Sequence, residues 1–166
     1  MRISDHLTRD RIALDLGAGP KTEVLGRLVS MLAASLGISD PEPILAEVLR
    51  RESIMSTGIG DGIAIPHAAA DGIGGPAIAI GVAPGGIDFE SVDQKPVHVI
   101  FLLIGSRDTP GLQLKALARI ARLTREPGFI AGLLKAATPG EALALVANKD
   151  EEPEVAPPPP ELKRSL

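Results

Sequence analysis

One histidine and the glycine-rich loop before it form the part of this sequence best suited to chemistry. His67 follows a loop in which two hydroxyl side chains, Ser56 and Thr57, precede three closely spaced glycines. A glycine-rich backbone can turn several N–H groups toward one anion, and hydroxyl groups add further donors. A neutral imidazole beside such a cradle can accept a phosphoryl group and pass it on. The pattern predicts phosphoryl transfer at His67, with these hydroxyls and the backbone at Gly58 and Gly60 as donors.

Two arginines lie upstream of this histidine. Arg50 and Arg51 carry guanidinium forks that suit phosphate oxygens, and Arg51 is the stronger candidate for a ligand. Two ordinary structural interpretations stay open: the arginines fit a solvated helix end, and His67 fits a buried or turn histidine. The convergence of hydroxyls, glycines and guanidinium groups on one stretch favours a functional site.

The remaining histidines do not suggest a competing site. His6 lies near the N-terminus with no polar cluster around it, and His98 lies within an apolar run that suits a structural role. Three scattered histidines lack metal-ligand spacing, so no metal site is expected. No Gly-x-Ser-x-Gly elbow supports a serine hydrolase.

An earlier glycine motif, at residues 14–20, is similar to the first motif of nucleotide-dependent methyltransferases and to a phosphate loop. The phosphate-loop pattern fails because Asp15 and Pro20 stand where glycines are required. A methyltransferase also needs a second strand ending in an acid, whereas the next segment starts another helix at Asp40-Pro41. We therefore interpret the motif as a short strand at 12–13, a glycine turn and the start of a helix.

Composition narrows the class of protein that surrounds the site. The 166 residues include no Cys, which excludes a disulfide scaffold, a thiolate metal site and a cysteine nucleophile. The formal net charge is −4, but five acids and two bases lie from Asp150 onward, so the rest is nearly neutral. Near-neutrality with only three aromatic residues argues against nucleic-acid binding. No apolar run has the roughly 20 residues of a membrane span, and no signal-peptide core is present, so a cytoplasmic protein is expected.

Five helices are predicted from apolar spacing and capping signals. Asp40-Pro41 is an N-cap followed by proline, and Thr138 with Glu141 matches a capping box. The expected helices span 21–36, 41 to about 52–55, 112–123, 127–137 and 138 onward.

Strand-length apolar runs lie at residues 63–65, 77–82 and 97–104. They lack alternation, which indicates burial on both faces in a sheet covered by helices. Pro84-Gly85-Gly86 predicts a turn, and 87–90 a short strand after it. The order of elements indicates a helix-covered mixed α/β sheet in a single domain over residues 1–149. The acidic, proline-rich segment 150–166 is predicted to be a disordered or polyproline tail.

The stretch from Arg51 to His67 closely resembles the signature of the enzyme IIA proteins of the phosphoenolpyruvate-dependent phosphotransferase system, of the fructose/mannitol and nitrogen-regulatory type. The resemblance covers roughly residues 3–147. Further matching segments follow in order at Gly86–Phe89, Asp93, Pro96–Val97, Phe101–Leu103 and Leu114–Leu123.

This resemblance implies a phosphocarrier of the cytoplasm with a mixed, mostly parallel sheet flanked by helices on both faces. It implies that His67 takes a phosphoryl group from a small histidine-phosphorylated carrier protein. The group then passes to a sugar-transport IIB domain, or its presence regulates a partner protein. The aligned Arg51 is similar to the phosphate-site arginine of the family. No metal or nucleotide cofactor is implied.

The chain departs from the family pattern at two places. Gln113 stands where the family carries a second active-site histidine, and Gln can donate an N–H but cannot become a cation. Ala68-Ala69-Ala70 follows His67 where the family often has a small and a basic residue. These departures keep open a second hypothesis, a non-catalytic regulatory binding module of the same fold with weak or no phosphotransfer.

Overall fold

Two long strands near the middle of the chain form the centre of the fold. In the computed structural model, which describes residues 1–150, β5 (Ala77–Ile87) and β6 (Val97–Ser106) pair in antiparallel fashion. Both strands are apolar and mostly buried over their length, as expected for strands covered on both faces. This confirms the predicted runs at 77–82 and 97–104.

Four shorter strands complete one six-stranded sheet with the order β1-β5-β6-β3-β2, in which β4 also pairs with β6. The parallel pairs are β1 with β5, β3 with β6 and β4 with β6, and the antiparallel pairs are β5 with β6 and β2 with β3. The shorter strands are β1 (Ile12–Ala13), β2 (Gly58–Gly60), β3 (Ile63–Ala64) and β4 (His67–Ala70). The sheet is therefore mixed and mostly parallel, as the resemblance implied.

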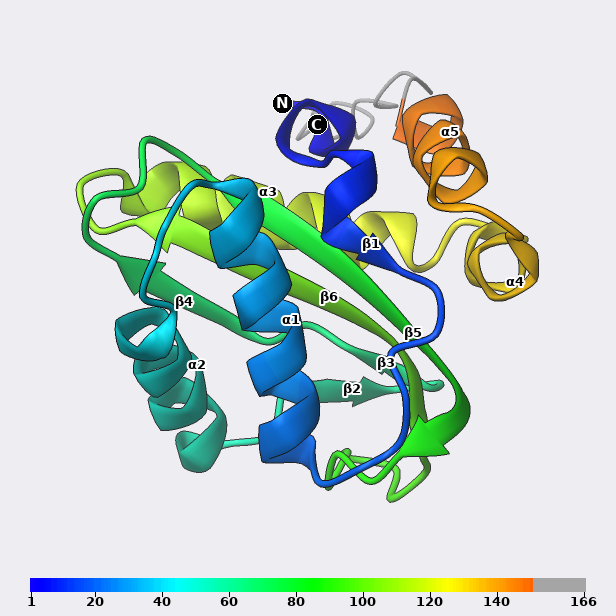
Figure 1. Cartoon of the computed structure of the whole chain (residues 1–166). Helices are drawn as coiled ribbons and strands as arrows, with labels where there is room; N and C mark the ends of the chain where they lie inside the picture. The colour runs from blue at the N-terminus through cyan, green and yellow to red at the C-terminus, as the bar shows by residue number, and fades with distance from the viewer. Residues whose placement is uncertain (151–166) are drawn as a thin grey trace, which may run out of the picture.

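Helices cover both faces of the sheet (Figure 1). On one face lie α1 (Lys21–Ser35) and α2 (Glu42–Ile54). On the other lie α3 (Pro110–Leu123), α4 (Phe129–Lys135) and α5 (Pro139–Asp150), with the short 3-10 helix Ile3–His6. A second 3-10 helix, Arg9–Arg11, contacts both α1 and α5. All five predicted helices are present, with ends within a few residues of the expected ones.

Successive residues of β5 face the two helical layers in turn. Ala77 and Ala79 pack toward α1 and α2, whereas Ile78 and Ile80 pack toward the opposite core. The small side chains let α1 approach closely, and a Cβ at Gly81 would lie 2.7 Å from the Leu16 side chain. Alternation of size, rather than of polarity, therefore distinguishes the two faces of this strand.

The turn predicted at Pro84-Gly85-Gly86 is wrong, because these residues lie within β5. The register with β6 shifts between Val82 and Ile87, so extra residues bulge out while the strand continues. Gly86 has a φ of +78°, which a glycine adopts without strain. The strand expected over 87–90 is likewise reduced to Ile87, the last residue of β5.

The last helix reaches one residue beyond the predicted domain end. Thr138 Oγ1 accepts the N–H of Glu141 at 3.2 Å, as a capping box requires, and α5 then runs to Asp150. Asp150 is buried, so it belongs to the folded domain and not to the tail. The rest of the predicted tail, 151–166, lies outside the described residues.

The early glycine motif forms the predicted strand, turn and helix start. β1 ends at Ala13, and α1 begins at Lys21. The Arg27 guanidinium donates to the carbonyls of Leu16 at 3.0 Å and Ala18 at 3.1 Å, which ties the intervening loop to α1. Within residues 1–150, no helix is long and apolar enough to cross a membrane.

Candidate functional site

The histidine singled out from the sequence opens a strand that sequence periodicity did not predict. His67 is the first residue of β4, and its register partner on β6 is Leu103. Among the described strands β4 pairs only with β6, so it lies at an edge of the sheet. Ala68 and Ala70 are buried in the core beneath α1 and α2, while His67 and Ala69 are half-buried. The alanine run is thus a packing feature that seats His67 at the sheet edge.

A hydrogen bond defines the tautomer of the imidazole. His67 Nδ1 lies 2.9 Å from the carbonyl oxygen of Ile65. A carbonyl oxygen only accepts, so Nδ1 carries the proton and donates it. In the neutral ring, Nε2 then holds the lone pair. This is the arrangement that orients a histidine for nucleophilic attack through Nε2.

His67 lines a cavity of about 170 Å³. The walls come from α2, from β4, from the residue that follows β6, and from the first turn of α3. The lining residues are Glu47, Arg50, Arg51, His67, Ala68, Ala69, Arg107 and Gln113. Three guanidinium groups, one carboxylate and one imidazole therefore share a small space, which suits a doubly charged anion.

Glu47 holds two of these arginines, and we call Glu47, Arg50 and Arg107 the Glu47 clamp. Arg50 Nη2 lies 3.0 Å from Glu47 Oε2, and Arg107 Nη2 lies 3.6 Å from Glu47 Oε1. Arg107 Nε also pairs with the exposed Asp71 at 3.2 Å. Hydrogen bonding from Arg50, followed by the nearby positive charges, keeps the pKa of the Glu47 carboxyl below its usual value. Glu47 is therefore an anion at neutral pH.

Arg51 and Gln113, which were both predicted to contact phosphate, also line this cavity. Arg51 Nη1 donates to the carbonyl of Met55 at 2.9 Å, which anchors the guanidinium at the C-terminal end of α2. Gln113 Nε2 donates to the carbonyl of Ala68 at 3.2 Å. Its side chain also packs over Gly105, where a Cβ would lie 2.6 Å from Oε1. The structure thus brings Arg51 and Gln113 together with His67.

Ser56 and Thr57 do not line this cavity. The Thr57 N–H and Oγ1 donate to Glu52, with the hydroxyl bond at 2.6 Å. Ser56 Oγ donates to the carbonyl of Phe89 at 2.7 Å. Internal partners therefore occupy both hydroxyls, and these residues brace the loop after α2.

The two glycines predicted as phosphate donors also lie outside the cavity lining. The Gly58 N–H donates to Ser56 Oγ at 3.1 Å, and a Cβ at Gly58 would fall 2.2 Å from Ser91 Oγ. Gly60, at a φ of +97°, belongs to the β2–β3 hairpin, which the Asp93 carboxylate holds by accepting the N–H of Asp61. Close packing and hairpin geometry explain these glycines without a bound anion.

His98 has a structural setting in β6. Its Nδ1 lies 3.2 Å from the carbonyl of Ala83, and its ring lies beside the position of Gly86. In residues 1–150 there is no group of three or more His, Cys, Asp or Glu side chains placed to hold a metal ion.

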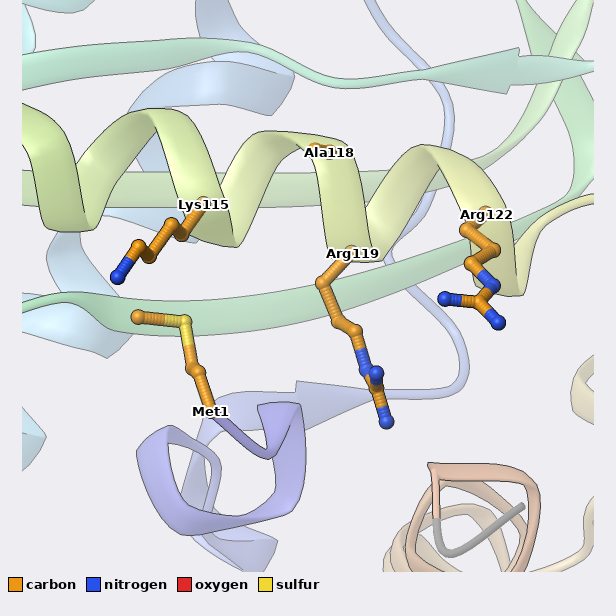
Figure 2. A pocket seen from close by; sticks show the side chains of 5 residues that line it. All are labelled: Met1, Lys115, Ala118, Arg119 and Arg122. Atoms are coloured by element: carbon orange, nitrogen blue, oxygen red, sulfur yellow. The ribbon is translucent and has the colours of Figure 1, made fainter. Parts of the chain in front are cut away.

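A second hollow, of about 410 Å³, lies between α3 and the start of the chain (Figure 2). Its lining includes Lys115, Arg119 and Arg122 from α3, together with Met1. Arg119 is already paired, because its Nε lies 2.8 Å from the buried carboxylate of Asp150. The hollow has no histidine in its lining, so the His67 cavity remains the candidate for phosphoryl transfer.

Comparison with known proteins shows the family to which the chain belongs. Residues 5–149 match the family described as phosphoenolpyruvate-dependent sugar phosphotransferase system, EIIA 2. The chain is 33% identical over 151 residues to a fructose-specific EIIABC component of Bacillus subtilis, and the match covers 91% of this chain and 24% of that protein. The chain thus spans about a quarter of that relative's length.

Solved structures show the same fold. The nitrogen regulatory protein IIA-Ntr of Neisseria meningitidis superposes with a TM-score of 0.80 at 26% identity, covering 87% of this chain and 98% of that one. The mannitol enzyme IIA of Escherichia coli, solved in complex with phosphorylated enzyme IIB, superposes at 0.72 with 20% identity, covering 86% and 97%. The chain belongs to the EIIA 2 family of the phosphoenolpyruvate-dependent sugar phosphotransferase system.

Two residues of the site escaped sequence analysis. Glu47 and Arg107 were not candidates, because neither lies in the glycine-loop motif. Arg107 directly follows β6, and its N–H donates to the carbonyl of Ala70 at the end of β4. The signal that leads to it is the parallel pairing of β4 with β6, which brings the ends of both strands together. Because the sequence does not predict β4, it does not place Arg107 near His67.

Proposed function

We propose that this chain is a phosphocarrier that accepts a phosphoryl group on Nε2 of His67. One observation supports this most directly. The Ile65 carbonyl fixes the proton on Nδ1, which leaves the Nε2 lone pair on a ring that lines an arginine-rich cavity. Phosphoryl transfer depends mainly on positioning and on charge stabilisation, and both are available here.

The transfer step conserves charge between two imidazoles. The Nε2 lone pair attacks the phosphorus of a donor phosphohistidine, and the donor's P–N bond breaks. The donor ring leaves with that electron pair as a neutral imidazole, because its other nitrogen carries a proton. His67 becomes a phosphoimidazolium that keeps its Nδ1 proton on the Ile65 carbonyl. No metal or nucleotide takes part in this step.

Arg51 and Gln113 have different roles in this scheme. Arg51, held by the Met55 carbonyl, supplies a permanent positive charge to the transferred oxygens. Gln113 can offer one N–H to a phosphoryl oxygen, but it supplies no charge and moves no proton. The donors originally expected from Ser56, Thr57, Gly58 and Gly60 have no part in it.

The proposed donor is a small histidine-phosphorylated carrier protein, and the proposed acceptor is a IIB domain. The acceptor is supported by the mannitol enzyme IIA, which has been solved with its phosphorylated IIB partner. The relatives include both a fructose-specific transporter component and a nitrogen regulatory protein. A regulatory target in place of a IIB domain therefore fits the same site.

The test is phosphorylation in a reconstituted system. The chain is incubated with phosphoenolpyruvate, enzyme I and the histidine carrier protein, and acid-labile phosphate is measured. The wild type is expected to incorporate one phosphoryl group, and His67→Ala none, whereas His98→Gln is expected to behave as the wild type. Incorporation that persists in His67→Ala contradicts the assignment, as does a wild type that is never labelled.

A second candidate function is a binding module that transfers no phosphoryl group. Gln113 favours it, because an uncharged side chain occupies a wall of the cavity where the family carries a histidine. Under this hypothesis the chain binds its partner equally well with or without His67, and the wild type transfers no phosphate. Phosphorylation of the wild type separates the two, because only the phosphocarrier is labelled. Gln113→His then tests the glutamine: faster phosphorylation supports a place for residue 113 in the transfer, and an unchanged rate places it outside the chemistry.

A further inference from the structure

The His67 cavity carries more positive charge than Arg51 alone would provide. Arg50, Arg51 and Arg107 all line it, and Glu47 is the one carboxylate in the lining. With a neutral imidazole, these groups sum to a net charge of two positive units. The phosphoryl oxygens bring about −1.5 to −2 near neutral pH and the phosphoimidazolium ring adds +1, so transfer lowers the positive charge of the cavity without reversing it.

Glu47 occupies the guanidinium groups that an incoming phosphoryl group would need. Its two carboxylate oxygens face different arginines, Oε2 toward Arg50 and Oε1 toward Arg107. These are the forks that suit bidentate contact with phosphate oxygens. All three side chains of the clamp are partly open to solvent, and ion pairs in such settings are weak. A group with higher charge can therefore displace the carboxylate readily.

We infer that the Glu47 clamp is an anion-exchange device, in which Glu47 keeps Arg50 and Arg107 at the cavity and gives them up to the phosphoryl group on His67. In this arrangement Arg107 is a phosphate-binding residue, and Glu47 is a positioning residue that also competes with phosphate. Arg107 supplies the permanent charge that Gln113, which lines the same cavity, does not. The inference rests on the proposed function and adds the residues that set its charge balance.

The local backbone gives Arg107 a defined position for this role. Its N–H donates to the Ala70 carbonyl, so the end of β6 is tied to the end of the strand that starts with His67. On its other side, Nε pairs with Asp71, which is 87% exposed. Arg107 thus stands between two carboxylates and can turn toward the cavity without leaving a buried charge unpaired.

The first experiment measures binding of inorganic phosphate to the full, unphosphorylated chain by the shift of the His67 imidazole NMR signals. Glu47→Gln removes the competing charge, so we expect phosphate to bind about fivefold more tightly. Arg107→Gln is expected to weaken binding about tenfold, and Arg107→Lys to recover part of the loss. Arg125→Gln, an exposed arginine at a distance from the cavity, is the matched control and is expected to leave binding unchanged.

Salt separates an electrostatic exchange from a structural effect. The gain in Glu47→Gln is expected to shrink as ionic strength rises from 0.05 to about 0.5 M, because exposed charges are screened. A Glu47→Gln variant that binds phosphate more weakly than the wild type, or equally well, overturns the exchange. So does an Arg107→Gln variant that matches Arg125→Gln while its folding is intact by circular dichroism.

The second experiment follows phosphorylation of His67 from the phosphorylated carrier protein. Arg107→Gln is expected to lower kcat/KM about tenfold, and Glu47→Gln to raise the fraction phosphorylated at equilibrium. A wild type that is labelled while these variants behave like Arg125→Gln overturns the exchange alone. A wild type that is never labelled overturns the proposed function, and the phosphate-binding measurement still decides the exchange.

Discussion

Two of the three glutamates of helix α2, Glu47 and Glu52, have carboxylates with opposite surroundings. Glu47 is 28% exposed, lines the His67 cavity and faces two arginines that are themselves open to solvent. Glu52 is 3% exposed and accepts from Lys21, from the Thr57 N–H and from the Thr57 hydroxyl. The first is a partly exposed anion in the cavity lined by His67, and the second is a buried support for the loop that follows the helix.

The difference shows why residue type alone does not decide which side chains line the cavity. The hydroxyls of Ser56 and Thr57 are of a type that can donate to phosphate oxygens. In the fold, Ser56 donates to the Phe89 carbonyl and Thr57 donates to Glu52. Lys21 also contacts Phe89, with Nζ 3.3 Å from its carbonyl oxygen and 5.1 Å from its ring centroid. A buried network satisfies its own donors, so the donors left for a ligand are the guanidinium groups that line the His67 cavity.

The largest expected effect follows from breaking the buried network. Glu52→Gln leaves the Lys21 ammonium without its carboxylate and weakens both Thr57 bonds, so we expect the free energy of unfolding to fall by about 4 kcal/mol. Glu47→Gln, the matched change at the exposed site, is expected to alter it by less than about 0.5 kcal/mol. Urea denaturation measures both. Equal losses in the two variants would remove the distinction drawn between these glutamates.

Asp150, on the far side of the sheet, is a second buried carboxylate with a structural role. Its buried carboxylate accepts from Arg119 Nε at 2.8 Å and from the Ser4 N–H at 3.2 Å, which fastens α5 to α3 and to the start of the chain. Asp150→Asn is expected to cost about 3 kcal/mol in the free energy of unfolding, because it leaves Arg119 poorly paired. Phosphorylation of His67 is expected to continue at the wild-type rate in the folded variant. An unchanged free energy of unfolding in urea denaturation would mean that the Asp150–Arg119 pair contributes no stability.

Thr57→Val tests whether the hydroxyl is structural. The change keeps the side-chain shape but removes the donor to Glu52, so we expect a loss of about 2 kcal/mol in the free energy of unfolding. The kcat/KM for phosphorylation by the carrier protein is expected to stay within about twofold of the wild type. Thr57→Ser keeps the hydroxyl and serves as the control. A tenfold fall in kcat/KM for Thr57→Val alone would return Thr57 to the phosphate site.

The smallest expected effect concerns Asp93, an exposed carboxylate with backbone partners. The N–H groups of Lys95 and Asp61 lower the pKa of the Asp93 carboxyl, the former more strongly. A lowered folded-state pKa stabilises the fold above the unfolded value, about 3.9, and this contribution is lost as pH falls through the folded-state value. Asp93→Asn is therefore expected to be less stable than the wild type at pH 7, with the difference closing below about pH 4. A difference independent of pH in urea titrations would contradict this assignment.

Much of the fold was predictable because local patterns encode it. The apolar spacing of α1, the capping residues before α2 and α5, and the continuous apolar runs of β5 and β6 each have a local physical cause. The bulge at Pro84–Gly86 was not predictable in this way. Proline and glycine also favour a turn, and only the pairing of Ile87 with Val97 shows that the strand continues.

The sequence by itself singled out His67, the proposed nucleophile, and two residues that share its cavity, Arg51 and Gln113. It did so because these residues lie in motifs long enough to be distinctive. Only the tertiary structure decided that Arg107 and Glu47 join them and that Thr57 does not. Ion pairs and hydrogen bonds form between side chains that packing brings together, and packing here depends on a four-residue edge strand whose alanines carry no periodic signal. The residue types therefore determine which chemistry the cavity can support. The position of β4 beside β6 determines which residues line the cavity.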